Sequence, residues 1–143
     1  MPYRYLDDIA IADVAFEAWG ITLEEMMLAA SDATINVMIA NPDSIGAVES
    51  RKFELKDSQL DLLLFQLLQE LIFYKDAENL LLRVRALQLL AVPGEFAAVA
   101  EAQGERIDPA KHDLLVDVKA VTLHRLKVEA IFRGWRATVV LDV

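Results

Sequence analysis

Several kinds of residue are scarce in this 143-residue chain, and each shortage excludes a class of protein. The absence of cysteine excludes disulfide bonds, thiol catalysis and cysteine-based zinc sites. It also fits a reducing compartment, and we expect a cytoplasmic protein. Two histidines argue against a multi-histidine metal site. No apolar run reaches the roughly 18 residues that a membrane span needs, and the first eight residues lack the apolar core of a signal peptide.

Basic residues are also outnumbered, because 14 Lys and Arg stand against 23 Asp and Glu, which gives a net charge of −9. Affinity for nucleic acid comes from basic side chains that displace counterions from phosphate. The composition therefore disfavours direct binding of RNA or DNA. The composition is still compatible with an acidic protein that binds a basic RNA-handling protein.

The residues that are present indicate a globular protein. Hydrophobic residues make up 55% of the chain and charged residues 26%, a balance typical of a compact fold rather than a disordered chain. No linker, low-complexity tract or internal repeat divides the sequence, so we expect residues 1–143 to form a single domain. A chain of this length buries roughly 68% of its unfolded surface and needs no disulfide or zinc for stability.

The first half of the chain predicts two helices. Thr22, followed three residues later by a glutamate, forms a capping box before apolar residues at helical spacing. Asn41-Pro42-Asp43 ends this helix, because the residue before a proline avoids helical dihedral angles. Asp57-Ser58 is expected to cap a second helix, with an apolar stripe over Leu60–Ile72 and an end at Tyr74–Asp76.

The remaining segments favour strands, with glycine and proline between them. The predicted strands are Ile9–Trp19, Ala47–Leu55, Leu80–Val92, Phe96–Gln103, Val116–Leu126, Lys127–Phe132 and Trp135–Asp142. Leu80–Leu90 is also compatible with a helix, since it is rich in leucine and poor in β-branched residues. Early helices followed by a long run of strands indicate an α+β fold, with a largely antiparallel β-sheet packed with two main α-helices.

Two aspartates stand in apolar segments, where an ionised carboxylate is costly unless it is paired or bound to a metal. Asp13 interrupts the strand Ile9–Trp19, although a solvent-facing position at a strand end is an equal alternative. Asp142 follows the apolar run Val139–Leu141 and precedes the terminal carboxylate of Val143, and such charges repel unless a cation or an arginine lies between them. Oxygen ligands suit Ca²⁺, Mg²⁺ or Mn²⁺ rather than Zn²⁺. The alternative is a solvated, frayed C-terminus.

A turn-rich stretch with Glu105, Lys111 and His112 is a further candidate, because loops of this kind often carry function. The stretch is weak evidence for a chemical function, and His112 is expected to be solvated. Lys119 lies in a predicted apolar strand, where it either pairs with a carboxylate or faces solvent on a half-exposed sheet. His124 is expected on the face of the sheet with a hydrogen-bond partner.

Motifs of self-sufficient catalysis are absent from the sequence. It contains no glycine-rich phosphate loop, no G-x-S-x-G elbow, no HExxH and no readable nucleophile–base pair. A metal-dependent hydrolase, in which Asp13 and Asp142 activate a metal-bound water, remains a minor alternative that lacks a general base. The residues alone favour a small acidic α+β protein with a candidate oxygen-ligand metal site.

The order of motifs along the chain resembles that of the archease family. Three motifs of that family have similar segments in this chain: the helix motif W-L-N-E-L, the stretch GE-x-x-D-x-x-KH and the strand V-K-A-V-T-x-H. The matching segments, in chain order, are Ala12–Val14, Ala18–Gly20, Thr22–Glu25, Leu67–Leu71, Gly104–His112, Val118–His124 and Trp135–Val143. Each motif alone is weak, but together they extend over nearly the whole chain.

This resemblance implies a non-catalytic accessory protein of an RtcB-type tRNA-splicing ligase, which promotes guanylylation and multiple turnover of that ligase. It also implies a bound divalent cation, commonly Ca²⁺, with Mg²⁺ or Mn²⁺ as alternatives. The ligands carried over from the family motifs are Asp13, Asp142 and Val143, the last through its terminal carboxylate or main chain. Candidates for partner contact or support are Glu105, Lys111, His112 and Lys119.

The chain departs from the family at the N-terminal motif. The family usually has H-T-A-D, whereas this chain has Ala10-Ile11-Ala12-Asp13, so a histidine and a threonine are replaced by apolar residues. In the helix motif, Leu67 and Gln69 stand where the family prefers tryptophan and asparagine. These departures keep a second hypothesis open: a diverged interaction or scaffold protein with a different partner and a weakened metal site.

Overall fold

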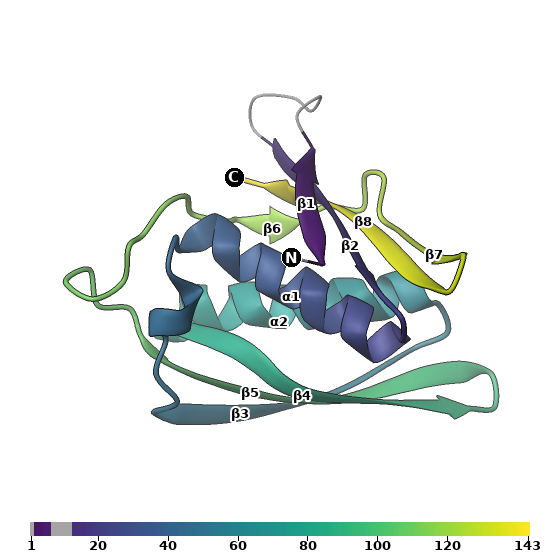
Figure 1. The fold of residues 1–143 in the computed structure, drawn as a ribbon. Coiled ribbons are helices and arrows are strands. Elements are labelled where there is room, and N and C mark those ends of the chain that lie inside the picture. Colours follow the sequence, from purple (N-terminus) through teal and green to yellow (C-terminus); the bar gives the residue numbers. More distant parts are fainter. Residues whose placement is uncertain (1, 7–12) are drawn as a thin grey trace.

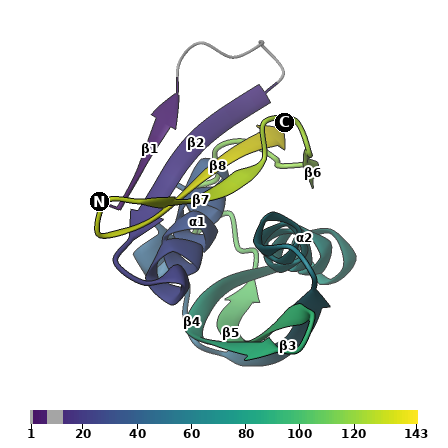
Figure 2. The ribbon, with the colours of Figure 1, turned by 90° about the vertical axis from the view of Figure 1, so that its right-hand side faces the viewer.

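The computed structural model describes residues 2–6 and 13–143. Two antiparallel β-sheets enclose two α-helices, α1 (Leu23–Met38) and α2 (Leu60–Glu78), which form the middle layer (Figure 1). Figure 2, turned by 90°, shows the same three layers from the side. Neither helix, nor any other within the described ranges, is long and apolar enough to cross a membrane.

The upper sheet of Figure 1 joins both ends of the chain. Its strand order is β1-β2-β8-β6, and β7 pairs with β8 as well. The bounds are Tyr3–Leu6 for β1, Asp13–Gly20 for β2, Ala120–Val121 for β6, Lys127–Ile131 for β7 and Gly134–Asp142 for β8. All of these pairs are antiparallel, and β2, near the start of the chain, lies beside β8, the last strand.

The lower sheet has three strands in the order β3-β5-β4. Strand β3 spans Glu49–Asp57, β4 spans Leu80–Val92 and β5 spans Glu95–Arg106, and a short 3₁₀ helix, Pro42–Ser44, precedes β3. Strands β4 and β5 form a long hairpin with an irregularity in register between Val84 and Ala86.

The core lies between the sheets, around the two helices. In β2, Phe16 and Ala18 are fully buried and belong to this core. Side chains alternate between the faces of a strand, so Asp13, Glu17 and Trp19 belong to the outer face of the upper sheet. Helix α2 contributes a stripe of buried leucines that packs against β3 and β4, which explains why its apolar residues recur at helical spacing.

The structure confirms the expected α+β class, with two main helices and antiparallel strands. The first helix begins as predicted: the Thr22 hydroxyl accepts a hydrogen bond from the Glu25 N–H (3.1 Å), and the Glu25 carboxylate accepts one from the Ile21 N–H (2.9 Å). Leu80–Val92 is a strand rather than a helix. The strands divide between two sheets, whereas the sequence suggested one sheet.

Other local expectations were wrong in part. Within the predicted strand Val116–Leu126, only Ala120–Val121 is a strand, because the N–H groups of Leu115 and Val116 donate instead to carbonyls at the end of α1. The cap of α2 is Gln59, which forms no side-chain cap hydrogen bond, and the helix continues beyond the expected end to Glu78.

At the N-terminus, β1 was not anticipated by the sequence pattern. The first four residues of the predicted strand Ile9–Trp19 lie outside the described residues, and its remainder forms β2.

Candidate functional site

Two of the predicted site residues face each other across adjacent strands. Asp13, at the start of β2, is the register partner of Asp142, at the end of β8. Directly opposed residues of an antiparallel pair point to the same face, with Cβ atoms about 4.5–5.5 Å apart. Both aspartates are half-buried, and so is the terminal Val143. The fold therefore brings together two carboxylates that lie 129 positions apart in the chain.

The other side of Asp142 is held by the segment before and within β6. The Lys119 N–H donates to the main-chain oxygen of Asp142 (2.8 Å), and Ala120 is its register partner. Thr122 donates to the Val140 carbonyl through both its N–H (3.0 Å) and its hydroxyl (3.1 Å). The Lys119 side chain is exposed and makes no salt bridge within the described ranges, so its main chain, rather than its charge, contacts this site.

Helix α2 holds that segment from below. The ammonium of Lys75 is buried and donates to the Asp117 carboxylate (2.5 Å) and to the Val118 carbonyl (2.6 Å). The side chain of Gln69 accepts a hydrogen bond from the Val121 N–H (3.1 Å). Sequence reasoning missed Lys75, although its position four residues after the buried Leu71 places it on the apolar stripe.

The chemistry of the paired aspartates fits a hard cation. In the described part of the chain, neither carboxylate has a salt bridge to a basic side chain that would relieve their mutual repulsion. The same part of the chain contains no cluster of three or more Asp, Glu or His side chains suited to a metal ion. Two carboxylates alone are a sparse ligand set, so a cation here needs further oxygen donors. The half-buried Val143 follows Asp142 directly. Ala10 and Ile11, which stand where the family usually has histidine and threonine, lie outside the described residues.

Glu105, Lys111 and His112 also come together, but on the lower sheet. The carboxylate of Glu105, on β5, accepts hydrogen bonds from the Lys111 ammonium (2.8 Å) and from the Gly46 N–H. These two donors, Lys111 first, hold the pKa of Glu105 below its ordinary value. The cluster joins the loop after β5 to the segment before β3, and it belongs to a different sheet from the paired aspartates.

His112 is buried, with 2% of its surface exposed, so the expectation of a solvated ring was wrong. The Asp108 N–H donates to its Nδ1 (2.9 Å), which places the proton of the neutral ring on Nε2. Nε2 lies 3.8 Å from a Glu105 oxygen and has no hydrogen bond within the described ranges. The tight turn at Asp108 folds the ring inward. His124 was expected on a sheet face and lies instead in an exposed turn.

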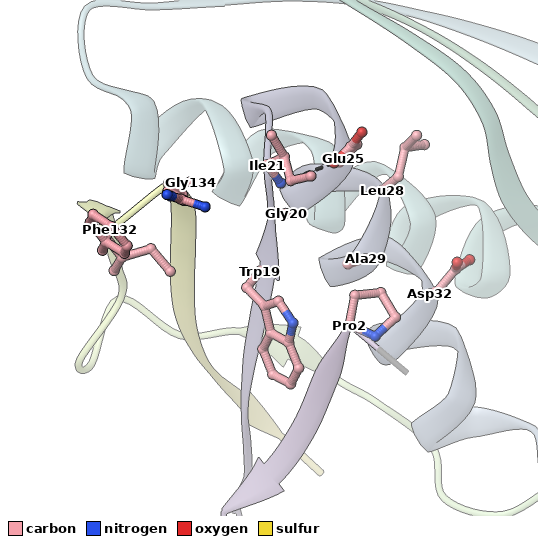
Figure 3. Close-up of a pocket in the computed structure, with 12 residues that line it drawn as sticks. Pro2, Trp19, Gly20, Ile21, Glu25, Leu28, Ala29, Asp32, Phe132 and Gly134 are labelled. Carbon is pink, nitrogen blue, oxygen red and sulfur yellow. Dashed lines mark hydrogen bonds between the residues drawn. The ribbon is translucent and has the colours of Figure 1, made fainter.

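A cavity that the sequence analysis did not predict lies at the opposite end of β2 and β8 from the paired aspartates. Its volume is about 510 Å³, and it opens between the β7–β8 hairpin and the start of α1 (Figure 3). Its walls are mainly apolar, with acidic side chains on the α1 side and an arginine on the hairpin. The lining residues are Pro2, Trp19, Gly20, Ile21, Glu25, Leu28, Ala29, Asp32, Ile131, Phe132, Arg133 and Gly134.

Comparisons with known proteins find one family over nearly the whole chain. The model of the Archease protein family matches residues 3–143. Protein archease of Methanosarcina barkeri is 33% identical over 142 residues, covering 99% of this chain and 95% of that protein. Protein archease of Pyrococcus abyssi is 32% identical over 133 residues, covering 92% of this chain and 93% of that protein.

Solved structures share the fold. The solution structure of protein 1598 from Methanobacterium thermoautotrophicum matches with a TM-score of 0.85 and 28% identity, covering 99% of both chains. The crystal structure of an archease, described as a possible chaperone, from Thermotoga maritima matches with a TM-score of 0.57. The latter is 19% identical and covers 96% of this chain and 97% of that one, so it supports the fold alone.

Proposed function

This chain belongs to the archease family, and we propose that it is a non-catalytic, cytoplasmic accessory protein that activates an RtcB-type tRNA-splicing ligase. In this proposal it promotes guanylylation of the ligase and lets each ligase molecule act repeatedly. The observation that carries the proposal is the pairing of Asp13 with Asp142, which places the family's two acidic motifs side by side on the sheet surface.

The charge of the protein supports docking on a basic enzyme. A net charge of −9 attracts an RNA-handling partner, whose surface must be basic to bind phosphate. Complementary charges raise the rate of encounter and orient the two proteins. The sequence has no nucleophile–base pair of its own, which favours an accessory role over catalysis.

We propose that Asp13, Asp142 and Val143 hold a divalent cation, with Ca²⁺ preferred over Mg²⁺ and Mn²⁺. When bound, the cation supplies the positive charge that two facing carboxylates lack. The chain itself presents the site on fixed elements: the Lys119 N–H holds the main chain of Asp142, and the contacts of α2 hold the segment that contains Lys119. The exposed Lys119 side chain is then available for contact with the ligase.

Guanylylation of the purified ligase tests the proposed activity. The amount of covalently bound GMP is measured over time with and without the protein, and with the variant Asp142→Asn. We expect the wild type to accelerate guanylylation and the variant to lose that effect. Asp113→Asn is the matched control, because it removes the same charge at an exposed side chain without a hydrogen bond in the described part of the chain, and it should behave as the wild type.

Thermal unfolding in a calcium titration tests the cation separately. Binding to the folded state alone stabilises it by RT ln(1 + [L]/Kd), about 2.7 kcal/mol at a hundredfold excess over Kd. We expect the wild type to gain stability with Ca²⁺ and both Asp13→Asn and Asp142→Asn to gain none. Equal melting temperatures with and without Ca²⁺ and Mg²⁺ in the wild type would contradict the metal site.

A second candidate is a scaffold protein that retains the archease fold but serves a different partner. The replacement of the family's His-Thr by Ala10-Ile11 favours it. No gain in guanylylation with wild-type protein would favour this candidate, whereas a gain that Asp13→Asn abolishes would exclude it.

A further inference from the structure

We infer that the cavity beside Trp19 receives an apolar side chain that is flanked by basic residues on the surface of the ligase. This inference rests on the proposed function and adds a second contact, at the opposite end of the sheet from the paired aspartates. The cavity volume of about 510 Å³ is ample for one large side chain.

Two large apolar side chains stand exposed on the rim of the cavity. Ile21, between β2 and α1, is 76% exposed, and Phe132, at the tip of the β7–β8 hairpin, is 87% exposed. In Figure 3 they lie on the two sides of Gly134, and Trp19 forms the wall below them. Large apolar side chains gathered around a concave surface are typical of interaction sites. The guanidinium of Arg133 lies 5.1 Å from the centre of the Phe132 ring and supports it.

The cavity is formed before any partner arrives, because main-chain hydrogen bonds fix its walls. The Trp19 N–H donates to the Pro2 carbonyl (2.9 Å), and the Ile21 N–H donates to the Glu25 carboxylate (2.9 Å). Gly20, Ala29 and Gly134 are among the lining residues, and a Cβ atom at Gly134 would collide with the main-chain oxygen of Gly20. A pre-formed pocket costs little ordering entropy on binding, so its apolar area contributes effectively to affinity.

The charges around the cavity favour a basic neighbour for the apolar side chain. Glu24 and Glu25 occupy the first turn of α1, and within the described ranges neither forms a salt bridge. Asp32, farther along α1 in the cavity lining, forms a salt bridge with Arg83 at 3.3 Å. Arg133 on the hairpin wall stacks on Phe132 and forms no salt bridge with Glu24 or Glu25 within the described ranges. The two glutamates beside the apolar pocket therefore complement a segment that pairs a large apolar residue with Lys or Arg.

One partner is large enough to contact both ends of the sheet. Asp13 and Gly20 are the two ends of β2, and seven residue steps of about 3.3 Å put them roughly 23 Å apart. A standard interface covers about 800 Å² on each partner, a patch roughly 32 Å across. Trp19 lies on the same face as Asp13 and directly opposite Arg136, so the outer face is continuous between the two ends.

The affinity of the protein for the purified ligase, measured by surface plasmon resonance with the ligase immobilised, tests this inference. Phe132→Ser and Ile21→Ser alter exposed side chains, so they should leave the melting temperature unchanged. We expect Phe132→Ser to raise Kd at least about tenfold and Ile21→Ser about fivefold, as truncation of large apolar contact residues at an interface does. Glu24→Gln should slow association and reduce its dependence on salt. At a saturating concentration of the variant, Phe132→Ser should activate the ligase as well as the wild type does. Asp142→Asn should not activate it at any concentration.

Matched controls are Phe73→Ser on α2, where the ring is 55% exposed, and Val48→Ser before β3, where the side chain is 74% exposed. Both should bind within twofold of the wild type. Wild-type affinity in Phe132→Ser and Ile21→Ser would overturn this inference alone. A wild-type protein that does not bind the ligase would overturn the inference together with the proposed function.

Discussion

Replacing Lys75 by methionine is expected to destabilise the protein by about 1–3 kcal/mol. The side chain is only 7% exposed, and its ammonium lies 2.5 Å from Asp117, 2.6 Å from the Val118 carbonyl and 2.7 Å from Asp76. Methionine has a similar length, so it occupies the space of the Lys75 side chain with an apolar end. The substitution therefore removes the charge and the hydrogen bonds while it leaves no large cavity.

The magnitude follows from what each partner loses. The side chains of Asp76 and Asp117 are 57% and 68% exposed, so water replaces the ammonium at little cost. The hydrogen bond to the Val118 carbonyl is buried, and an acceptor left unpaired in such a place costs about 1–3 kcal/mol. Part of this loss is offset because the ammonium of Lys75 no longer has to be desolvated.

Calorimetry of the wild type and Lys75→Met measures the effect. A domain of this size has an unfolding entropy of roughly 0.3 kcal/mol per degree, so the melting temperature should fall by roughly 3–10 °C. Hydrogen exchange should rise at residues 118–121, which the ammonium holds against α2. The control is Lys52→Met. The Lys52 side chain is 59% exposed and its ammonium lies 3.7 Å from Glu54, so this substitution should change stability by less than about 1 kcal/mol. If Lys75→Met were as stable as the wild type, the ammonium would not hold this segment.

Two further predictions concern the lower sheet. Lys111 holds the pKa of Glu105 below its ordinary 4.5, so the carboxylate contributes stability above that pH and loses it as the pH falls through the lowered value. The melting temperatures of wild type and Glu105→Gln should therefore differ at pH 7 and converge on acidification below 4.5, and a constant gap would refute this. A Cβ atom at Gly104 would collide with the main-chain oxygen of Leu81, so Gly104→Ala should cost about 2–4 kcal/mol in denaturant unfolding. The adjacent Gln103→Ala should cost far less, and equal losses would contradict the steric account.

Local signals in the sequence were sufficient for the helices and for most strands. The capping box at Thr22 and the stripe of leucines in α2 act within a few residues, so they can be recognised without tertiary structure. The segment after His112 shows the limit of such patterns. Its apolar residues resemble a strand, but its N–H groups find carbonyls at the end of α1 rather than on a neighbouring strand.

The candidate aspartates were visible in the sequence, and the family resemblance implied that they share one cation, but the strand register that pairs them was not visible. Asp13 and Asp142 attract attention as charges in apolar segments, whereas the register that joins them depends on the antiparallel pairing of β2 with β8. A slip of one residue in that register would put the two carboxylates on opposite faces. Nothing local to either strand specifies the register, because it depends on how the whole sheet packs over α1.

Burial of polar residues was the least predictable feature. Lys75 and His112 stand among polar neighbours in the sequence, yet both are buried, one on the apolar stripe of α2 and the other behind a tight turn. The cavity beside Trp19 also combines residues from β2, α1 and the β7–β8 hairpin, which only the fold brings together.

The number of ligations completed per ligase molecule tests the central claim most directly. The assay uses excess RNA substrate and a fixed amount of ligase, with no added protein, with wild type or with Asp142→Asn. The account predicts that the ligase alone stops after about one turnover, that the wild type sustains many, and that Asp142→Asn sustains no more than the ligase alone. Equal turnover with and without the wild-type protein would contradict it.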